Sequence, residues 1–337
     1  MKSVCKLFMV IALLSITASA MAGTLQKVQE NKELVLGVSE GVAGFSAPDS
    51  NGKWAGFDVD MGKAVAAAVL KDPNAIKFVP LASKQKIVAV SSGQVDLSRG
   101  TTWTMKRDCK QGVDFTAVLF YDGQGLMVKK SQGVSKALDL DGASVAVVSG
   151  TTSELNVADF ARANNIKLEI VVFESKKEAF NAYVAGRADA FTTDISQLAS
   201  LRAGAANPDG HIILPEVFSK EPLCPFVRHG DQQWKDLVTW VLFGLIEAEE
   251  KGITQANVLT MKASSTDPVI QRMLGATGDV GSFVDLDNDW LVRAVQAVGN
   301  YGEMYDRNFG PDSALKIPRG HNNLWTKGGL IYAMPIR

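Results

Sequence analysis

Strand-like and helix-like segments alternate along the chain, and this pattern constrains its fold more than any other feature. Short apolar runs typical of strands are separated by longer segments in which apolar residues have helical spacing. Strands that alternate with helices pair in parallel and form an α/β sheet. The first unit is predicted from strands at 33–39, 75–81 and 95–98 and from helices at 57–70 and 84–93.

The same order restarts at residue 143. The second unit is predicted from strands at 144–150, 168–173 and 188–194 and from helices at 153–165 and 176–187. The two units have no close sequence similarity, so they share only their architecture. Two similarly built α/β lobes are therefore expected.

Two segments have the composition of connectors between these lobes. Residues 121–133 contain three glycines, and residues 216–234 contain two prolines. The amphipathic segment 234–252 then predicts a long helix that stops at a glycine. If this helix packs on the first unit, the first lobe is discontinuous and the chain crosses twice between the lobes. A cleft then forms where strand ends and helix N-termini face each other.

The first 22 residues have the organisation of a secretory signal peptide. Two lysines precede an apolar run of about ten residues, which is too short to span a bilayer, and small-x-small sites follow at 18–20 and 20–22. Cys5 precedes the apolar run, so a lipid-anchored cysteine at the cleavage point is not supported. We predict cleavage after Ala20 or Ala22, export, and no direct insertion into the membrane.

Charge and cysteine content narrow the possible partners. The 35 basic and 36 acidic residues are not grouped in blocks of one sign, so nucleic acid and anionic membranes are not expected partners. Cys109 and Cys224 remain after processing. Two cysteines in a protein of an oxidising compartment indicate either a disulfide, here near the hinge, or two buried free thiols.

Enzyme and metal motifs are weak or missing. Residues 37–41 fit G-x-S-x-G, but a nucleophile elbow needs a helix directly after the turn, and here a loop containing Pro48 and Asn51-Gly52 follows. The three histidines are isolated, and the sequence has no H-E-x-x-H, paired C-x-x-C, Walker A or dinucleotide motif. We therefore expect no metal and no cofactor, and an enzyme would have to rely on carboxylates or arginine alone.

Three polar groups at predicted strand ends could instead bind a zwitterion. Arg107, with Thr102 nearby, could bind a carboxylate through its planar pair of donors, or be a surface charge. The turn at Thr152 could bind the same carboxylate at a helix N-terminus, or only belong to a capped helix. Asp194 could pair with an ammonium group, or cap the following helix. Together they would form an amino-acid receptor.

These residues lie within a broader resemblance. The segment GFDVDM at 56–61, followed by a helix of small apolar residues, is similar to the signature of family 3 solute-binding proteins, the periplasmic receptors of polar amino-acid ABC transporters. Nearly the whole mature chain resembles the general L-amino-acid-binding branch, through GFSAPDSNGKWAGFDVDM, TTWTMKRD, YDGQGLMV, SGTTSELNVADF, FTTDISQLASLR, SKEPLCPFVRHGDQQW and the tail segments VGNYGEMYDRN and LWTKGGLIYAMPIR.

The resemblance implies a two-lobed type II periplasmic-binding-protein fold with a two-strand hinge. It implies that Arg107 and Thr102 bind the ligand carboxylate, that Thr152 adds a helix-turn contact, and that Asp194 binds the ammonium. This chain departs from the family pattern at DLSRG, so no role is transferred to Arg99. The expected boundaries are a signal peptide at 1–22, a first lobe at 23–129 and 224–337, and a second lobe at 130–223.

The resemblance places the ligand side chain against Ser39, Phe45, Ser46 and Trp54, and such a pocket predicts broad specificity. Glu40 could favour a basic or amide side chain, or be a solvated loop residue. Family members usually lack both cysteines, and their joint presence here favours the Cys109–Cys224 disulfide.

The implied function is capture of L-amino acids, without catalysis, by a monomer in the periplasm and delivery to a membrane-embedded ABC permease. Two alternatives remain open at this point. One is a prephenate- or arogenate-dehydratase-like enzyme on the same scaffold, and the other is the ligand-binding component of a sensory system.

Overall fold

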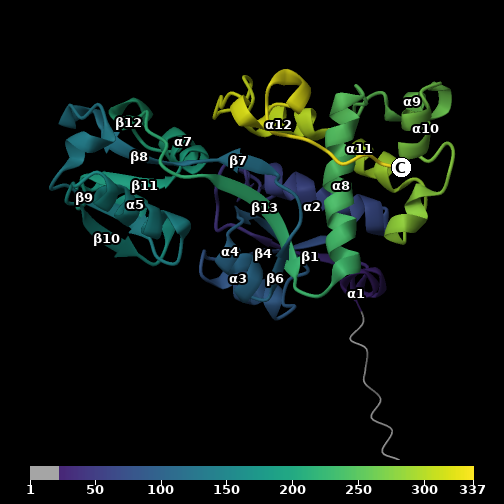
Figure 1. The fold of residues 1–337 in the computed structure, drawn as a ribbon, viewed down its shortest axis with the longest axis horizontal. Helices are drawn as coiled ribbons and strands as arrows, with labels where there is room; N and C mark the ends of the chain where they lie inside the picture. The colour runs from purple at the N-terminus through teal and green to yellow at the C-terminus, as the bar shows by residue number, and fades with distance from the viewer. Residues whose placement is uncertain (1–22) are drawn as a thin grey trace, which may run out of the picture.

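The computed structural model describes residues 23–337, so the predicted signal peptide at 1–22 lies outside the described residues. The chain forms two α/β lobes, each built on its own sheet (Figure 1). The predicted two-lobed α/β class is confirmed. Among residues 23–337 no helix is both long and apolar enough to cross a membrane.

The first lobe contains a sheet with strand order β4-β1-β5-β13-β6, and β7 pairs with β13 beside it. Strands β1, β4 and β5 are parallel, as predicted, whereas β13 is antiparallel to its neighbours. The strands of this lobe are β1 (Leu34–Val38), β4 (Ile76–Pro80), β5 (Leu97–Thr102), β6 (Val113–Phe115), β7 (Phe120–Asp122) and β13 (Glu221–Arg228), with a small hairpin of β2 (Ala47–Pro48) and β3 (Trp54–Ala55).

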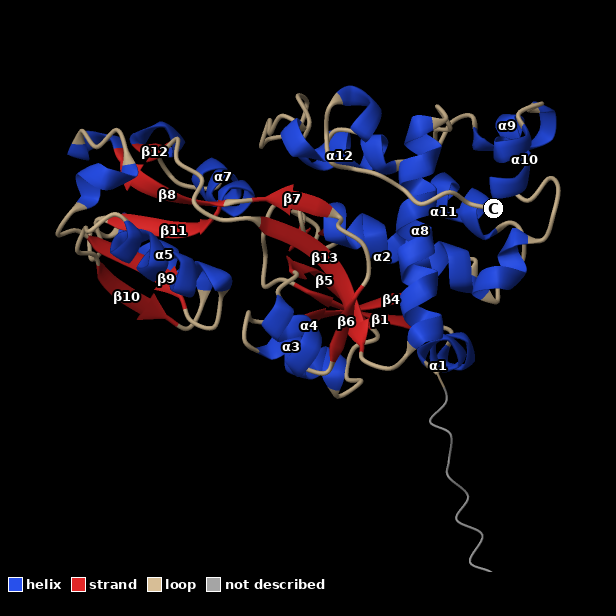
Figure 2. Ribbon diagram, viewed as in Figure 1, coloured by secondary structure: helices blue, strands red, loops and turns tan. Residues whose placement is uncertain are grey.

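Helices of the first lobe come from both ends of the chain, and Figure 2 shows them covering the sheet and extending away from the second lobe. The predicted long helix is α8, which packs with α2 and α11 in one large apolar core. The helices are α1 (Thr24–Asn31), α2 (Phe57–Leu70), α3 (Gln85–Ser91), α4 (Met105–Lys110), α8 (Gln232–Glu250), α9 (Val258–Ser264), α10 (Pro268–Met273), α11 (Trp290–Val298) and α12 (Tyr301–Phe309).

The second lobe contains a sheet with strand order β10-β9-β11-β8-β12. Apolar clusters lie on both faces of this sheet, under η2 and α5 on one face and under α6 and α7 on the other. Its elements are β8 (Gln124–Lys129), β9 (Ser144–Val148), β10 (Glu169–Phe173), β11 (Ala190–Asp194), β12 (His211–Ile213), α5 (Thr152–Ala163), α6 (Lys176–Val184), α7 (Ile195–Ala203) and the 3-10 turn η2 (Ala137–Leu140).

The chain crosses between the lobes at Gly123 and again at residues 214–220. Strand β8 was expected in the first lobe, but it pairs with β11 and β12 of the second sheet, so the first crossing lies before β8 rather than after it. The second crossing ends at Glu221, where β13 begins, rather than at residue 224. The two crossings touch, because a Cβ atom added at Gly123 would lie 2.2 Å from Val217 Cγ1 and 3.1 Å from the carbonyl oxygen of Ser219.

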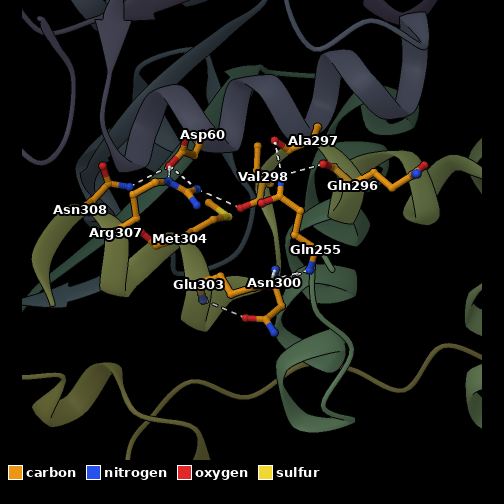
Figure 3. Close-up of polar contacts among 10 residues, drawn as sticks. All are labelled: Asp60, Gln255, Gln296, Ala297, Val298, Asn300, Glu303, Met304, Arg307 and Asn308. Atoms are coloured by element: carbon orange, nitrogen blue, oxygen red, sulfur yellow. Dashed lines mark hydrogen bonds and ion pairs between the residues drawn. The ribbon is translucent and has the colours of Figure 1, made fainter. Parts of the chain in front are cut away.

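The C-terminal segment after α10 is anchored to the first lobe by polar contacts to helix α2. Asp60 accepts hydrogen bonds from Arg307 Nη2 and Asn308 Nδ2, both at 2.8 Å (Figure 3). At the other end of α2, the Arg293 guanidinium donates to the carbonyl oxygens of Ala67 and Ala68. The Ala67 carbonyl oxygen also accepts from the Lys71 amide at the end of the helix, so Arg293 adds a second donor there as well as a donor to Ala68.

Candidate ligand-binding site

The carboxyl ends of strands from both lobes meet around a small cavity of about 40 Å³, which we call the inner chamber. Strand ends and helix N-termini place polar groups at such an edge. The first lobe lines the inner chamber with Ser83, Lys86, Arg99, Gly100, Thr101, Thr102, Arg107 and Leu223, and the second lobe lines it with Val148, Thr151, Thr152, Ser153, Lys176, Thr193, Asp194 and Gln197.

A second cavity of about 190 Å³, the outer chamber, adjoins the inner one. The two share Ser83, Arg99, Val148 and Lys176. The remaining lining of the outer chamber is Ser39, Glu40, Gly41, Val42, Leu81, Glu174, Ser175, Lys177, Phe180 and Leu201. Near Glu174, Lys84 Nζ reaches across from the first lobe and lies 2.9 Å from its carboxylate.

Arg107 and Thr102 lie together on the first-lobe side of the inner chamber. Thr104 caps helix α4 by accepting a hydrogen bond from the Arg107 amide, which fixes the backbone at this residue. The Arg107 Nη1 atom donates to the Thr102 carbonyl oxygen at 2.9 Å. Burial is the largest influence on the pKa of Arg107 and lowers it. Arg107 lines the chamber, and a planar guanidinium can bind a carboxylate through paired donors.

Thr152 lies opposite, in the first turn of α5. The cap of this helix is Thr151, which accepts from the Glu154 amide, while the Glu154 carboxylate binds the Gly150 amide rather than that of Thr151. The Thr152 hydroxyl donates to Glu221 of β13 at 3.0 Å, so it links the second lobe to a hinge strand. Thr152 and Ser153 line the chamber, so the start of α5 lies beside it, and the positive end of the helix dipole favours an anion there.

Asp194 ends β11 and is only 6% exposed. It precedes α7, but its side chain makes no capping hydrogen bond, so the alternative role as a helix cap is not seen. Instead it accepts from Gln197 Nε2. Burial raises the pKa of Asp194 to about 6, and the Glu221 carboxylate adds to the rise. The structure thus brings Arg107, Thr102, Thr152 and Asp194 to one chamber.

Of the four residues expected around the ligand side chain, Phe45 lies in the core of the first lobe and Trp54, which is partly buried, packs against that core. Phe45 is 5% exposed and packs against Phe120 and Phe309, with ring centroids 5.4 and 4.8 Å apart. Trp54 stacks on Phe78. Neither lines either chamber. The structure therefore places the two aromatic side chains in and against the apolar core, where burial of large apolar surface is favourable.

Ser39 and Ser46 bond to each other. Ser46 is fully buried, and its hydroxyl lies 2.7 Å from that of Ser39, which also donates to the Ser46 carbonyl oxygen. Ser39 reaches the wall of the outer chamber, whereas Ser46 lies behind it. No helix follows Ser39 before Phe57, so the G-x-S-x-G segment does not form a nucleophile elbow.

Cys109 and Cys224 are both free, so the expected disulfide is corrected. Cys109 is exposed on α4, whereas Cys224 is fully buried on β13 in a cluster with Phe115 and Phe226. The two side chains therefore lie in different environments, solvent for Cys109 and an apolar cluster for Cys224. Burial raises the pKa of the Cys224 thiol, which keeps it protonated and unreactive.

Three cations of the chambers were not anticipated as site residues: Lys86 of α3, Arg99 of β5 and Lys176 of α6. Lys176 follows Ser175, the cap of a helix that begins directly after a strand. That is the same position in a strand-to-helix turn as Thr152, and it is the signal that could have identified Lys176. Within residues 23–337, no group of three or more His, Cys, Asp or Glu could hold a metal ion.

Comparison with known proteins shows the family to which the chain belongs. Residues 34–256 match the model of bacterial extracellular solute-binding proteins, family 3. The chain is 52% identical to the general L-amino acid-binding periplasmic protein of Rhizobium johnstonii, over 97% of this chain and 96% of that protein. It is 49% identical to the glutamate/glutamine/aspartate/asparagine-binding protein of Rhodobacter capsulatus, over 96% of each chain.

Among solved structures, a periplasmic binding protein from Brucella ovis with glutathione bound superposes with a TM-score of 0.92. It is 50% identical, over 94% of this chain and all of that chain. These relatives are named as binding proteins, which indicates that this chain binds a solute and is not an enzyme. From the matched residues, the identities and the shared two-lobed fold, the chain belongs to the bacterial extracellular solute-binding proteins of family 3.

Proposed function

We propose that this protein captures L-amino acids in the periplasm and delivers them to the permease of an ABC transporter. The observation that carries the proposal is the position of Arg107 and Asp194 on opposite lobes of one chamber. A fixed cation and a fixed anion facing each other match the carboxylate and ammonium that all free amino acids share. The names of the two relatives above support the same ligand class.

The full set of ligand contacts depends on closure of the two lobes. Arg107 and Thr102 come from the first lobe, whereas Thr152 and Asp194 come from the second, so a zwitterion completes its contacts only when the lobes meet. A ligand shifts the equilibrium between open and closed forms only through its better contacts in the closed form. The permease would then recognise the closed form, with the exported monomer, processed after residue 20 or 22, as the carrier.

A second candidate ligand is glutathione, which is bound in the Brucella ovis relative. The outer chamber favours it, because a ligand held by its amino-acid end at Arg107 and Asp194 could extend past Arg99 into that space. A dehydratase acting on prephenate is disfavoured, because prephenate has no ammonium group to pair with the buried Asp194.

Isothermal titration calorimetry of the mature chain tests the proposal. The panel contains L-amino acids, glutathione and prephenate. We expect saturable binding of L-amino acids, and Arg107→Ala should weaken binding of every L-amino acid by about 30-fold or more, because it removes one partner of a buried charge pair. The matched control is Arg162→Ala, since Arg162 is an exposed arginine of α5. Absence of binding by all L-amino acids, or an unchanged affinity in Arg107→Ala, would overturn the proposal.

A further inference from the structure

The inner chamber carries more positive charge than a zwitterion needs. Its lining includes four cationic side chains but one carboxylate, that of Asp194. A bound amino acid would pair its carboxylate with Arg107 and its ammonium with Asp194, under the function proposed above. The other three cations, Lys86, Arg99 and Lys176, would then have no negatively charged group of the ligand to pair with.

These three cations, which we call the basic trio, lack strong partners in the protein. Arg99 Nη1 donates only to the neighbouring Gly100 carbonyl oxygen at 3.3 Å, and its buried Nε atom has no hydrogen-bond partner. Lys86 is 8% exposed, and within the described part of the chain its ammonium makes no hydrogen bond or ion pair. Lys176 donates to the amide oxygen of Gln197, a neutral group. Buried charges without partners are costly.

Nearby carboxylates offset only part of this charge. Asp58 is 2% exposed behind the chamber, where one oxygen accepts from the Gly100 amide and the other has no partner. Glu221 is already bonded by Thr152, Asn156 and Ser219. Glu40 lies on an exposed part of the outer chamber, where water screens it. A net positive charge therefore remains at the basic trio.

The trio also lies where a ligand side chain must pass. Arg99 and Lys176 line both chambers, so they stand at the passage from the inner to the outer one. Arg99 and Lys86 come from the first lobe and Lys176 from the second, so an anion at this point would connect the two lobes, as the α-carboxylate does. An arginine with a free donor and two ammonium groups is a suitable donor set for a carboxylate.

We propose that Lys86, Arg99 and Lys176 form a second anion subsite that binds the side-chain carboxylate of an acidic L-amino acid, so that glutamate and aspartate are preferred over glutamine and asparagine. This inference rests on the proposed function and adds the ligand class. The amide ligands fit the same space but cannot provide the missing negative charge, so discrimination is electrostatic rather than steric.

Calorimetry with glutamate and glutamine, which are nearly identical in shape, tests the proposal. The wild-type protein should bind glutamate at least about tenfold more tightly than glutamine. Lys86→Gln and Lys176→Gln should each weaken glutamate binding by about tenfold while changing glutamine binding less than about threefold. Retained glutamine binding shows in the same experiment that the variants are folded. The matched control is Lys77→Gln, an exposed lysine of β4, which should change neither affinity.

Two results would overturn the proposal while leaving the proposed function intact. One is wild-type binding of glutamine as tight as that of glutamate. The other is an equal loss of both ligands in the Lys86 and Lys176 variants, which would assign these lysines to the α-carboxylate or to the fold. Failure to bind any amino acid would instead contradict the proposed function itself.

Discussion

At the scale of single residues, two groups of the inner chamber with shifted pKa values, Asp194 and Lys176, lie on the second-lobe side, where the Gln197 side chain bonds to both. Burial raises the pKa of Asp194 to about 6, with Glu221 adding to the rise and Lys176, Lys86 and Arg99 opposing it. Burial lowers the pKa of Lys176 to about 7, with Arg99 adding to the fall and Asp194, Glu40 and Asp58 opposing it. Asp122, beside Asp194, has a pKa raised to about 8 by its burial.

These shifts predict different pH profiles for acidic and neutral ligands. An ammonium binds the ionised form of Asp194, so affinity for every amino acid should fall as the pH drops through about 6, with protons released on binding near and below that pH. A side-chain carboxylate binds the protonated form of Lys176 and raises its pKa, so glutamate affinity should also fall as the pH rises through about 7.

Calorimetry across this pH range, in buffers of different ionisation enthalpy, measures both affinity and proton exchange. Glutamate should give a bell-shaped profile and take up protons near neutral pH, whereas glutamine should lose affinity only on the acid side. A glutamate profile that is flat above pH 7, or that matches the glutamine profile, would contradict the role assigned to Lys176.

Part of this site could be predicted from the sequence. Arg107, Thr102, Thr152 and Asp194 each lie at a strand end or shortly after one. Strand ends of parallel sheets converge, so the structure brings these residues together; their ligand contacts stay a prediction. Phe45 and Trp54 could not be placed in this way, because an apolar residue in a loop can face the core or a cleft. Lys176 was missed because a lysine in a first helical turn has the pattern of a solvated surface residue.

At the scale of elements, the C-terminal extension contacts the hinge as well as the first lobe. The side chain of Asn322, in a 3-10 turn, bonds both backbone polar groups of Tyr121 in β7, at 2.7 Å to the amide and 3.0 Å to the carbonyl oxygen. Nearby, Arg319 makes a two-pronged contact with Glu249 of α8. The extension therefore fixes one of the two strands that lead into the second lobe.

Asn322→Ala should lower the free energy of unfolding by about 1–2 kcal/mol, because it leaves two partly buried backbone groups of β7 without their partner. Urea unfolding measures this change. The control is Asn323→Ala, the adjacent and more exposed asparagine, which should have little effect. Equal losses in the two variants would show that Asn322 does not act through β7.

Element boundaries were predictable where periodicity and local signals agreed. Helix α2 spans 57–70, as predicted from its small apolar residues. Strand β5 runs to Thr102, beyond its predicted end at 98, because backbone pairing with β13 extends it through polar residues. Strand β8 was assigned to the wrong lobe for a related reason: its partners, β11 and β12, lie more than 60 residues away in the sequence, and local patterns contain no information about such pairing.

At the scale of the whole molecule, binding depends on how the two crossings allow the lobes to meet. The crossings are in contact at Gly123, and Lys84 meets Glu174 across the outer chamber. The latter pair is exposed, so salt screens it and it adds little to closure. Salt does not weaken the contact between the two crossings, because that contact is steric rather than electrostatic. Geometry at Gly123 should therefore influence the closed form more than this ion pair does.

Gly123→Ala should weaken the binding of all ligands by the same factor. The added methyl group would lie 2.2 Å from Val217 Cγ1, so the second crossing must move, at a cost of about 1–3 kcal/mol. Because neither chamber includes Gly123, the ratio of glutamate to glutamine affinity should stay at its wild-type value, in contrast to Lys86→Gln and Lys176→Gln. Calorimetry with both ligands and thermal unfolding measure the effect. Gly204→Ala is the control, since its Cβ atom would make only ordinary contacts, the nearest at 3.7 Å. A changed affinity ratio in Gly123→Ala would show that the hinge shapes the chambers directly, rather than setting only how readily the lobes close.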